Sequence, residues 1–392
     1  MPTVVRRIAA ITGSRADYGL MQPVHRALAL DRRFELHLTV TAMHLAPQFA
    51  ASLAEVRADG FGVLHEVSTL VDGDDGAAMA QSLGNAVVRL SRLFAELQPD
   101  AVLLHGDRSE MLAGAIAAAH MNLPAVHMSG GDRSGSIDDS VRAAISKLAH
   151  FHLTSCDEST QRLLSLGESP ERILQVGDPA LDRLRCTAFL PLDTLAAELD
   201  LPPGERFVVA TLHPVSDEAD RAASQMTALL EALESSGLTA VFTYPNTDAG
   251  GAAMSATLES WRGKPFVRIE PSLGSQRYLS LLRHAAAVVG NSSSGIIESP
   301  SLHLPAVNIG SRQHGRARAA NVIDVPFERD AIRAALHRAL HDAAFREQVA
   351  GCRSPYGDGR AAERTVDVLA RLRLGPQLTA KWRATHGSFL EL

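Results

Sequence analysis

Carboxylates whose types and spacing could do chemistry stand between residues 105 and 139. Asp107 lies in a His-Gly-Asp-Arg run, and three more, Asp132, Asp138 and Asp139, lie within eight residues of a Gly-rich loop. Clustered carboxylates raise one another's pKa, which suits general acid and base steps. The pattern therefore predicts proton transfer. The plain alternatives are a solvated acidic loop and, for Asp107, a helix cap.

The sharpest signal for binding is the run Gly-Asn-Ser-Ser-Ser-Gly-Ile-Ile-Glu at residues 290–298. Hydroxyls and backbone N–H groups that converge at a helix start after a strand suit a diphosphate. We expect this role for Ser292, Ser293 and Ser294, with a serine-capped helix as the alternative. Glu298, about one turn further on, can accept hydrogen bonds from ribose hydroxyls, as a carboxylate does in dinucleotide folds.

Other polar residues also follow expected strands. Arg15 enters a helix in a run that lacks the Gly-x-Gly-x-x-Gly fingerprint, so it predicts a phosphate contact, or else a turn capped by Asp17. His213 ends a strand, where contact with phosphate, acid–base work and a structural role are equally good interpretations. Arg312 and Arg316 are spaced to reach the same phosphates, with a solvated loop as the alternative.

Short apolar runs that alternate with helical stretches must position these loops. Helices are expected at residues 18–29, 77–97 and 109–120, among others. Strands are expected at residues 7–12, 35–41, 101–105, 125–128 and 152–154, and then, after a Pro-rich joint at 201–204, at 207–212, 239–243, 266–269, 287–290 and 306–309. Such alternation indicates parallel sheets covered on both faces.

The fold class is therefore α/β, with two doubly wound Rossmann-like domains at residues 1–195 and 200–370. We expect the tail at 375–392 to form a helix that packs on the first domain. Ligands of open α/β sheets bind beyond the carboxyl ends of the strands, so the cleft between the domains is the expected site.

The composition of the chain argues against several classes of binding partner. The 392 residues carry a net charge of −6, which argues against a general basic surface for nucleic acid. Three widely spaced cysteines fit a reducing compartment and no disulfide framework. We find no signal peptide and no apolar window of about 18 residues. We expect a cytoplasmic protein with no membrane partner and no metal motif.

Together the motifs resemble those of the hydrolysing UDP-N-acetylglucosamine 2-epimerases, in order, over about residues 7–370. The run at 290–298 is one of them. The others are Gly-Ser-Arg-Ala-Asp-Tyr-Gly at 13–19, Met-His-Leu at 43–45, Gly-Asp-Arg at 106–108, Gly-Gly-Asp at 130–132, Ile-Asp-Asp-Ser-Val-Arg at 137–142, His-Pro at 213–214, Tyr-Pro-Asn-Thr-Asp-Ala-Gly-Gly at 244–251 and Pro-Tyr-Gly-Asp-Gly at 355–359.

The resemblance implies a glycosyltransferase-B-like fold and a defined reaction. One group removes the proton at sugar C2 while the nucleoside diphosphate leaves from C1, and the resulting glycal is hydrated from the face that inverts C2. The implied catalytic residues are Asp107, Asp132, Asp138 and His213. The implied substrate-binding residues are Arg15, His44, Asn246, Ser292, Ser293, Ser294, Glu298, Arg312 and Arg316.

The resemblance also implies a nucleotide-sugar substrate, no cofactor, a homo-oligomer (dimer or tetramer) and a place in amino-sugar metabolism such as sialic acid biosynthesis. The chain departs from the family at Asp132, where Glu is usual, at Ala143, where His is usual, and at Ser134, where Thr is usual. UDP-N-acetylglucosamine is the first expectation for the substrate. A UDP-2,4-diacetamido-trideoxy sugar and a GDP-linked amino sugar are the alternatives.

Three other functions fit the same motifs. A non-hydrolysing 2-epimerase would return the nucleotide sugar intact. A glycosyltransferase of the same fold would need an acceptor, since fold does not fix function. A non-catalytic protein would bind the nucleotide sugar and release nothing.

Overall fold

The computed structural model describes residues 5–47, 50–73, 75–134, 138–202, 204–246, 248–271, 273–381 and 388–390. Residues 135–137 of the acidic loop, Thr247, and residues 382–387 and 391–392 of the expected tail lie outside these ranges. The chain forms two compact units. The first is Met1–Asp132, Ile137–Arg183 and Gly357–Leu392, and the second is Arg133–Ser136 and Leu184–Tyr356.

The first unit is built on a seven-stranded parallel sheet in the order β3-β2-β1-β4-β5-β6-β7. Alternate residues of β1 point into different apolar layers: Ile8 and Ala10 join one core cluster, and Ala9 and Ile11 join the other. Helices therefore cover both faces, as buried parallel strands require. The strands are β1 Arg6–Thr12, β2 Phe34–Thr41, β3 Val63–Val67, β4 Ala101–His105, β5 Ala125–Met128, β6 Phe151–Thr154 and β7 Ile173–Gln175.

The helices of this unit divide between the two faces. The cluster that contains Ile8 includes side chains of α1 and α14, and the cluster that contains Ala9 includes side chains of α3, α4 and α5. The helices are α1 Arg15–Leu30, η1 Ala42–Leu45, α2 Ala50–Asp59, α3 Gly76–Leu97, α4 Ser109–His120, α5 Asp138–Leu148, α6 Asp157–Ser165, η3 Pro170–Arg172, α7 Pro179–Cys186, α14 Ala361–Arg371 and α15 Pro376–Thr379.

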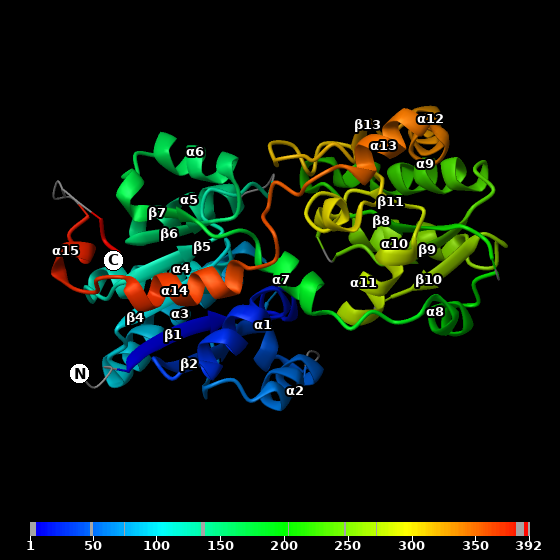
Figure 1. Ribbon diagram of the computed structural model, residues 1–392. Helices are drawn as coiled ribbons and strands as arrows, with labels where there is room; N and C mark the ends of the chain where they lie inside the picture. The colour runs from blue at the N-terminus through cyan, green and yellow to red at the C-terminus, as the bar shows by residue number, and fades with distance from the viewer. Residues whose placement is uncertain are drawn as a thin grey trace. The chain divides into compact units, whose positions relative to one another are not determined.

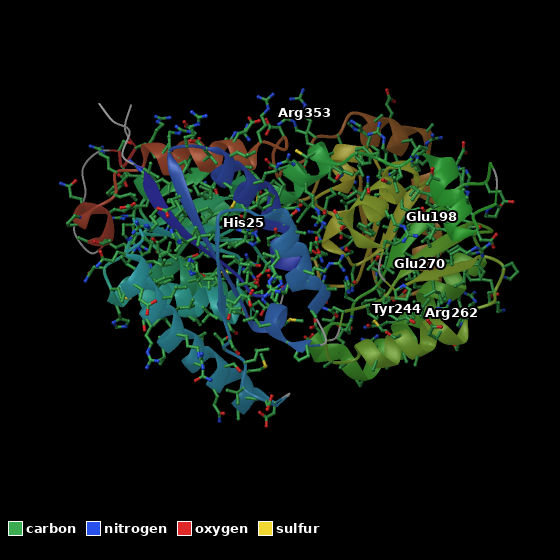
Figure 2. The ribbon with its side chains drawn as sticks, turned by 90° about the horizontal axis from the view of Figure 1, so that it is seen from below. His25, Glu198, Tyr244, Arg262, Glu270 and Arg353 are labelled. Atoms are coloured by element: carbon green, nitrogen blue, oxygen red, sulfur yellow. The ribbon has the colours of Figure 1, made fainter. Side chains whose placement is uncertain are left out.

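The second unit repeats this plan with six parallel strands in the order β10-β9-β8-β11-β12-β13. At its surface Tyr244 and Arg262 both bind Glu259 (Figure 2). The strands are β8 Phe207–Thr211, β9 Thr239–Thr243, β10 Val267–Glu270, β11 Ala287–Gly290, β12 Ala306–Ile309 and β13 Val322–Val325. The helices are α8 Leu192–Leu199, η4 Ser216–Arg221, α9 Ala222–Glu234, α10 Gly251–Ser260, α11 Gly274–His284, η5 Ser293–Gly295, η6 Ser299–Leu302, α12 Arg329–His341 and α13 Ala343–Ala350.

The structure confirms the α/β class and all ten predicted strands, within a residue or so at their ends. It adds β3, β7 and β13, which the sequence analysis missed. β3 (Val-Leu-His-Glu-Val) and β13 (Val-Ile-Asp-Val) carry polar residues because they are edge strands that remain partly exposed, and β7 has only three residues. Such strands lack the continuous apolar run that marks a buried one.

The chain returns to its first unit after Tyr356. The sequence analysis counted residues up to 370 with the second domain, but α14 packs beside α1 in the first (Figure 1). Its buried face, which includes Ala362, Val366 and Leu369, is part of the first unit's core. The following α15 also contributes a buried residue, Leu378. None of the helices in the described ranges is long and apolar enough to span a membrane.

Candidate functional site

In each sheet there is one point at which the direction of the strand order reverses. The chain winds outward in opposite directions from the neighbouring pairs β1/β4 and β8/β11. In open α/β sheets ligands bind beyond the carboxyl ends of strands at such switch points. The loops after β1 and β4 carry Arg15 and Asp107, and the loops after β8 and β11 carry His213 and the three serines Ser292, Ser293 and Ser294.

Asp107 is fixed by a buried arginine of α5. Arg142 donates through Nη2 to the Asp107 carboxylate and through Nη1 to the Ser129 carbonyl oxygen at 2.9 Å. Only 7% of Arg142 is exposed. Ser129 holds a left-handed backbone with φ of 61°, a strained conformation of the kind found at functional sites. The N-cap of α4 is Arg108, so Asp107 does not cap that helix.

The other two carboxylates lie near this pair. The Asp132 carboxylate oxygen Oδ1 accepts hydrogen bonds of 2.5 Å from both Ser155 and Ser159. Asp138 is the exposed first residue of α5, one turn before Arg142 on the same helix face. Thus the loops after β4 and β5 and the start of α5 bring the three predicted carboxylates to one edge of the sheet.

His105, the last residue of β4, was not among the predicted site residues. Burial lowers its pKa, and the nearby carboxylates Asp17, Asp107 and Asp132 act against that shift. Its Nδ1 atom is buried and has no hydrogen-bond partner within the described part of the chain. The ring is therefore neutral at pH 7 and lies within electrostatic range of two proposed catalytic groups. The sequence signal was its place at a strand end, directly before Gly-Asp.

His44 is buried, with both ring nitrogens engaged. Its Nε2 lies 3.0 Å from Thr12 Oγ1, and its Nδ1 lies 2.6 Å from Ser52 Oγ. Thr12 in turn donates to Asp17 at 2.8 Å. Burial lowers the pKa of His44. The geometry gives His44 the role of holding the loops after β1 and β2 together.

Arg15 lies at the surface, with 59% of its side chain exposed, and pairs with Glu55 at 3.3 Å. The turn before it is capped, but by Ser14 rather than Asp17. Asp17 is the third helical residue and completes a capping box with Ser14. Its carboxylate also accepts from the Gly13 and Ser14 backbone N–H groups, both at 3.0 Å.

His213 in the second unit has a defined tautomer. The Asn246 backbone N–H donates to its Nδ1 at 3.0 Å, so the ring proton is on Nε2. Burial, and then the charge of Arg312, lowers the pKa of His213 to about 3. His213 is thus a neutral hydrogen-bond donor at physiological pH. The side-chain oxygen of Asn246 is buried and accepts no hydrogen bond from any residue that the structure describes.

Asn291, also missed from the sequence, ties the loops of this unit together. Its side chain accepts from the His213 backbone N–H at 2.7 Å and donates to the His213 carbonyl at 2.8 Å. Its own carbonyl accepts from Arg312 at 3.2 Å and from Gln313 at 2.8 Å. The loops after β8, β11 and β12 are thereby joined at one residue.

The serine run after β11 does not open an α-helix as expected. It forms the 3-10 turn η5, at whose start the Ser292 side chain accepts from the Ser294 N–H at 3.4 Å, and a second 3-10 turn, η6, follows at Ser299–Leu302. Gly290 precedes it with φ of 127°, and a Cβ atom there would lie 1.9 Å from the Thr211 carbonyl oxygen. This close approach sets the serines beside the end of β8.

Tyr278 of α11 is a further residue that the sequence did not single out. Its hydroxyl is buried and has no hydrogen-bond partner in the described ranges. Burial raises its pKa, and the Ser292, Ser294 and Glu298 side chains are near enough to affect that value. The phenol therefore belongs to the same cluster as the serine run and Glu298, which is half-buried.

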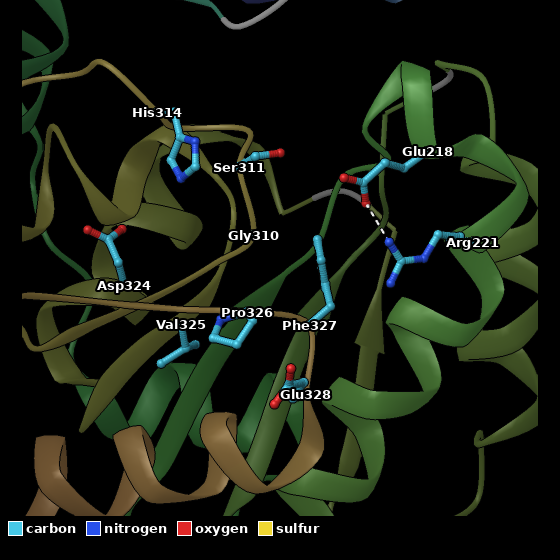
Figure 3. Close-up of a pocket in the computed structure, with 10 residues that line it drawn as sticks. All are labelled: Glu218, Arg221, Gly310, Ser311, His314, Asp324, Val325, Pro326, Phe327 and Glu328. Atoms are coloured by element: carbon cyan, nitrogen blue, oxygen red, sulfur yellow. Dashed lines mark ion pairs between the residues drawn. The ribbon is translucent and has the colours of Figure 1, made fainter.

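The loop after β12 carries Arg312 and Arg316 and borders a cavity. Arg316 donates to the Arg133 carbonyl at 2.7 Å. The cavity, of about 470 Å³, is lined by Ser311 and His314 of this loop, by Phe327 and Glu328 after β13, and by Glu218 of η4 (Figure 3). Within the described ranges no group of three or more His, Cys, Asp or Glu side chains has the arrangement of a metal site.

The chain is similar to known sugar-nucleotide enzymes over most of its length. The family model described as UDP-N-acetylglucosamine 2-epimerase matches residues 26–370. A Legionella pneumophila protein, UDP-N,N'-diacetylbacillosamine 2-epimerase (hydrolyzing), is 37% identical over 97% of this chain and 100% of its own length. A Neisseria meningitidis UDP-N-acetylglucosamine 2-epimerase is 34% identical over 87% of this chain and 89% of its own.

A solved structure shares the fold. The crystal structure of UDP-GlcNAc 2-epimerase from Neisseria meningitidis bound to UDP-GlcNAc superposes with a TM-score of 0.80 at 18% identity. The match covers 93% of this chain and 99% of that one. The two-unit, glycosyltransferase-B-like architecture expected from the sequence is therefore the architecture of this chain.

Proposed function

The chain belongs to the UDP-N-acetylglucosamine 2-epimerase family, and on that basis we propose that it is a hydrolysing nucleotide-sugar 2-epimerase that releases a free 2-epimerised amino sugar and a nucleoside diphosphate. One observation carries this proposal. Asp107, fixed by Arg142, and Asp132, fixed by Ser155 and Ser159, follow the neighbouring strands β4 and β5, and both lie near enough to His105 to affect its pKa. Proton transfer at C2 and hydration of a glycal both need positioned carboxylates.

The first unit supplies the acid–base groups in this proposal. The reaction removes the C2 proton, breaks the C1–O bond to the diphosphate, and then adds water across the C1–C2 double bond of the glycal. Asp107, Asp132 and Asp138 share these proton transfers. Arg142 holds Asp107 in place, so the carboxylate needs no reorganisation when the substrate arrives.

The second unit supplies the diphosphate-binding groups. The three serines and the Nε2–H of neutral His213 are donors suited to the negative charge that grows on the leaving group. Arg312 and Arg316 add positive charge in this unit. We propose Arg15 as a further phosphate contact on the ground of the family resemblance. Glu298 binds the ribose. Asn246 and His44 act by holding loops, since Asn246 fixes the His213 ring and His44 is buried.

We propose a UDP-linked 2,4-diacetamido-trideoxy sugar as the preferred substrate. The Legionella relative, whose name carries UDP-N,N'-diacetylbacillosamine, matches this chain at higher identity and over more of both chains than the Neisseria relative. UDP-N-acetylglucosamine, the first expectation from the sequence, is the second candidate because the family description and the Neisseria relative carry that name.

The test is proton NMR of the purified protein with each nucleotide sugar in deuterated water. We expect a free 2-epimerised sugar with deuterium at C2, together with UDP, and a higher kcat/KM for the diacetamido substrate. An intact epimerised nucleotide sugar would instead indicate a non-hydrolysing enzyme. Turnover only with an added acceptor would indicate a transferase, and binding without any release would indicate a non-catalytic protein.

Family membership also supports a homo-oligomer, a dimer or a tetramer. The mass of the protein in solution, measured by light scattering during size-exclusion chromatography, tests this. A monomer of 41.8 kDa at assay concentration would count against it.

A further inference from the structure

We propose that Ser155 and Ser159 are positioning residues that orient the Asp132 carboxylate for proton transfer. The inference rests on the proposed function, in which Asp132 is an acid–base group. It concerns two hydroxyls that neither the sequence motifs nor the family match assigns to the site.

Sheet register brings the three residues together. β5 and β6 are parallel neighbours, with Val126 opposite Phe151 and Met128 opposite Leu153. The loops that follow these strands therefore leave the same edge of the sheet. Asp132 lies four residues after β5, and Ser155 follows β6 directly. Ser159 lies in the first turn of α6, which starts two residues later.

The backbone forces this contact. Gly131 has φ of 77°, and a Cβ atom at that position would lie 2.2 Å from the Ser159 carbonyl oxygen. Only glycine permits this approach without moving the loop. The residue just before the carboxylate therefore packs against the first turn of α6, next to the serine that binds the carboxylate.

Both hydroxyls donate to the same carboxylate oxygen. Ser155 Oγ and Ser159 Oγ each lie 2.5 Å from Asp132 Oδ1, and 3.3 Å from one another. Both serines are 1% exposed, so water does not compete for these bonds. The structure shows no hydrogen bond to Oδ2 among the residues it describes, and Asp132 is only partly buried. Oδ1 thus anchors the group, and Oδ2 is left for the substrate.

The short side chain of Asp132 explains why the two serines matter for the position of its carboxylate. A glutamate at this position would carry its carboxylate about 1.5 Å further from the backbone, one C–C bond. It would then extend past hydroxyls that are spaced for aspartate. A misplacement of about 1 Å can cost on the order of 10²-fold in rate. We infer that Asp132 and the two serines form a matched set that fixes a short carboxylate.

The test compares Ser155→Ala, Ser159→Ala and the double variant with Ser165→Ala. Ser165 is a matched control because it lies on the same helix, is exposed, and its hydroxyl bonds to the Gln161 carbonyl. Alanine is the best helix former, so Ser159→Ala should keep α6 folded. We expect kcat to fall about tenfold in each single variant and on the order of 10²-fold in the double variant, as for hydrogen bonds to a charged group.

Three further readouts separate positioning from structure. UDP affinity and KM should change little, because the diphosphate groups belong to the second unit, and Ser155→Thr should restore most of kcat because it keeps the hydroxyl. Asp132→Glu should lower kcat less in the double alanine background than in the wild-type background, because the hydroxyls that are spaced for aspartate are then absent. A wild-type kcat in the double variant, or losses that follow the melting temperature alone, would overturn the inference. Lack of turnover by the wild-type protein would instead count against the proposed function.

Discussion

At the scale of the residue, the ion pair of Asp107 and Arg142 joins a proposed acid–base group to a buried counter-ion. Arg142 is buried, and the half-buried Asp107 is one of its partners. Removing one partner of a buried ion pair is destabilising. Asp138, in contrast, is exposed at the start of α5. The two carboxylates should therefore respond differently to the same substitution.

We predict that Asp107→Asn and Asp138→Asn each lower kcat by at least about 10²-fold, as expected for loss of an acid–base group. Only Asp107→Asn should also lower the free energy of unfolding, because it removes the negative charge from the ion pair with the buried Arg142. Steady-state kinetics and urea denaturation of both variants check this. Wild-type rates in both variants would refute their assigned chemistry, and equal stability losses would refute the distinction between them.

His25 gives a prediction on pH. It lies in the interior of the first unit, on the buried face of α1 (Figure 2), and neither ring nitrogen has a hydrogen-bond partner among the residues that the structure describes. Burial lowers its pKa from 6.5 to about 4. The unfolded chain therefore binds the proton more readily between these values. The stability linked to this group is complete above pH 6.5 and is lost as the pH falls toward 4.

We predict that His25→Leu reduces the acid sensitivity of the protein. Between pH 7.5 and pH 5 the wild type should lose roughly 2 kcal/mol more of its unfolding free energy than the variant. His120→Leu is the control, since His120 is exposed at the end of α4. Urea denaturation at the two pH values measures the difference. An identical pH dependence for wild type and His25→Leu would contradict the assignment.

At the scale of the element, the positions of the strand-end loops could be predicted from the sequence, but the hydrogen bonds that connect these loops could not. The apolar runs placed Asp107, Asp132, His213 and the serine run at the carboxyl ends of parallel strands, because strand position follows from hydrophobic pattern. Asn291 was invisible to that reasoning. Its importance comes from hydrogen bonds to His213, 78 residues away in the chain. Ser155 and Ser159 are hidden in the same way, because only the β5/β6 pairing brings them to Asp132.

We predict that Asn291→Ala weakens UDP binding about tenfold, because it removes two hydrogen bonds that fix the His213 backbone. The carboxylates of the first unit are untouched, so the loss should be in KM and in UDP affinity rather than in kcat alone. Isothermal titration with UDP measures it, with Asn122→Ala, at the turn after α4 in the first unit, as control. Unchanged affinity would show that Asn291 does not order the site.

At the scale of the whole molecule, the chain leaves its first unit and comes back. Residues Gly357–Leu392 return to complete it. The Asp182 carboxylate of α7 accepts from the Ala361 and Ala362 N–H groups, at 2.8 and 2.9 Å, and so caps the first turn of α14. The apolar stripe of α14 is visible in the sequence, but the unit on which the helix packs is not. A stripe shows that one face will be buried and does not specify which core will bury it.

Truncation tests this architecture. A chain ending at Tyr356 lacks α14, whose buried side chains belong to the first unit's core, so we predict that the first unit fails to fold cooperatively. A chain ending at Leu374 keeps α14 and loses only the tail beyond it. It should fold with a lowered melting temperature, since Lys381 is absent and can no longer bind the buried Glu168 or the carbonyls at the end of α5.

In both truncated chains the second unit keeps all of residues 184–356, so both should still bind UDP. Calorimetry and UDP titration of the two chains decide the matter, and a cooperative first-unit transition in the shorter chain would show that α14 is dispensable to the core.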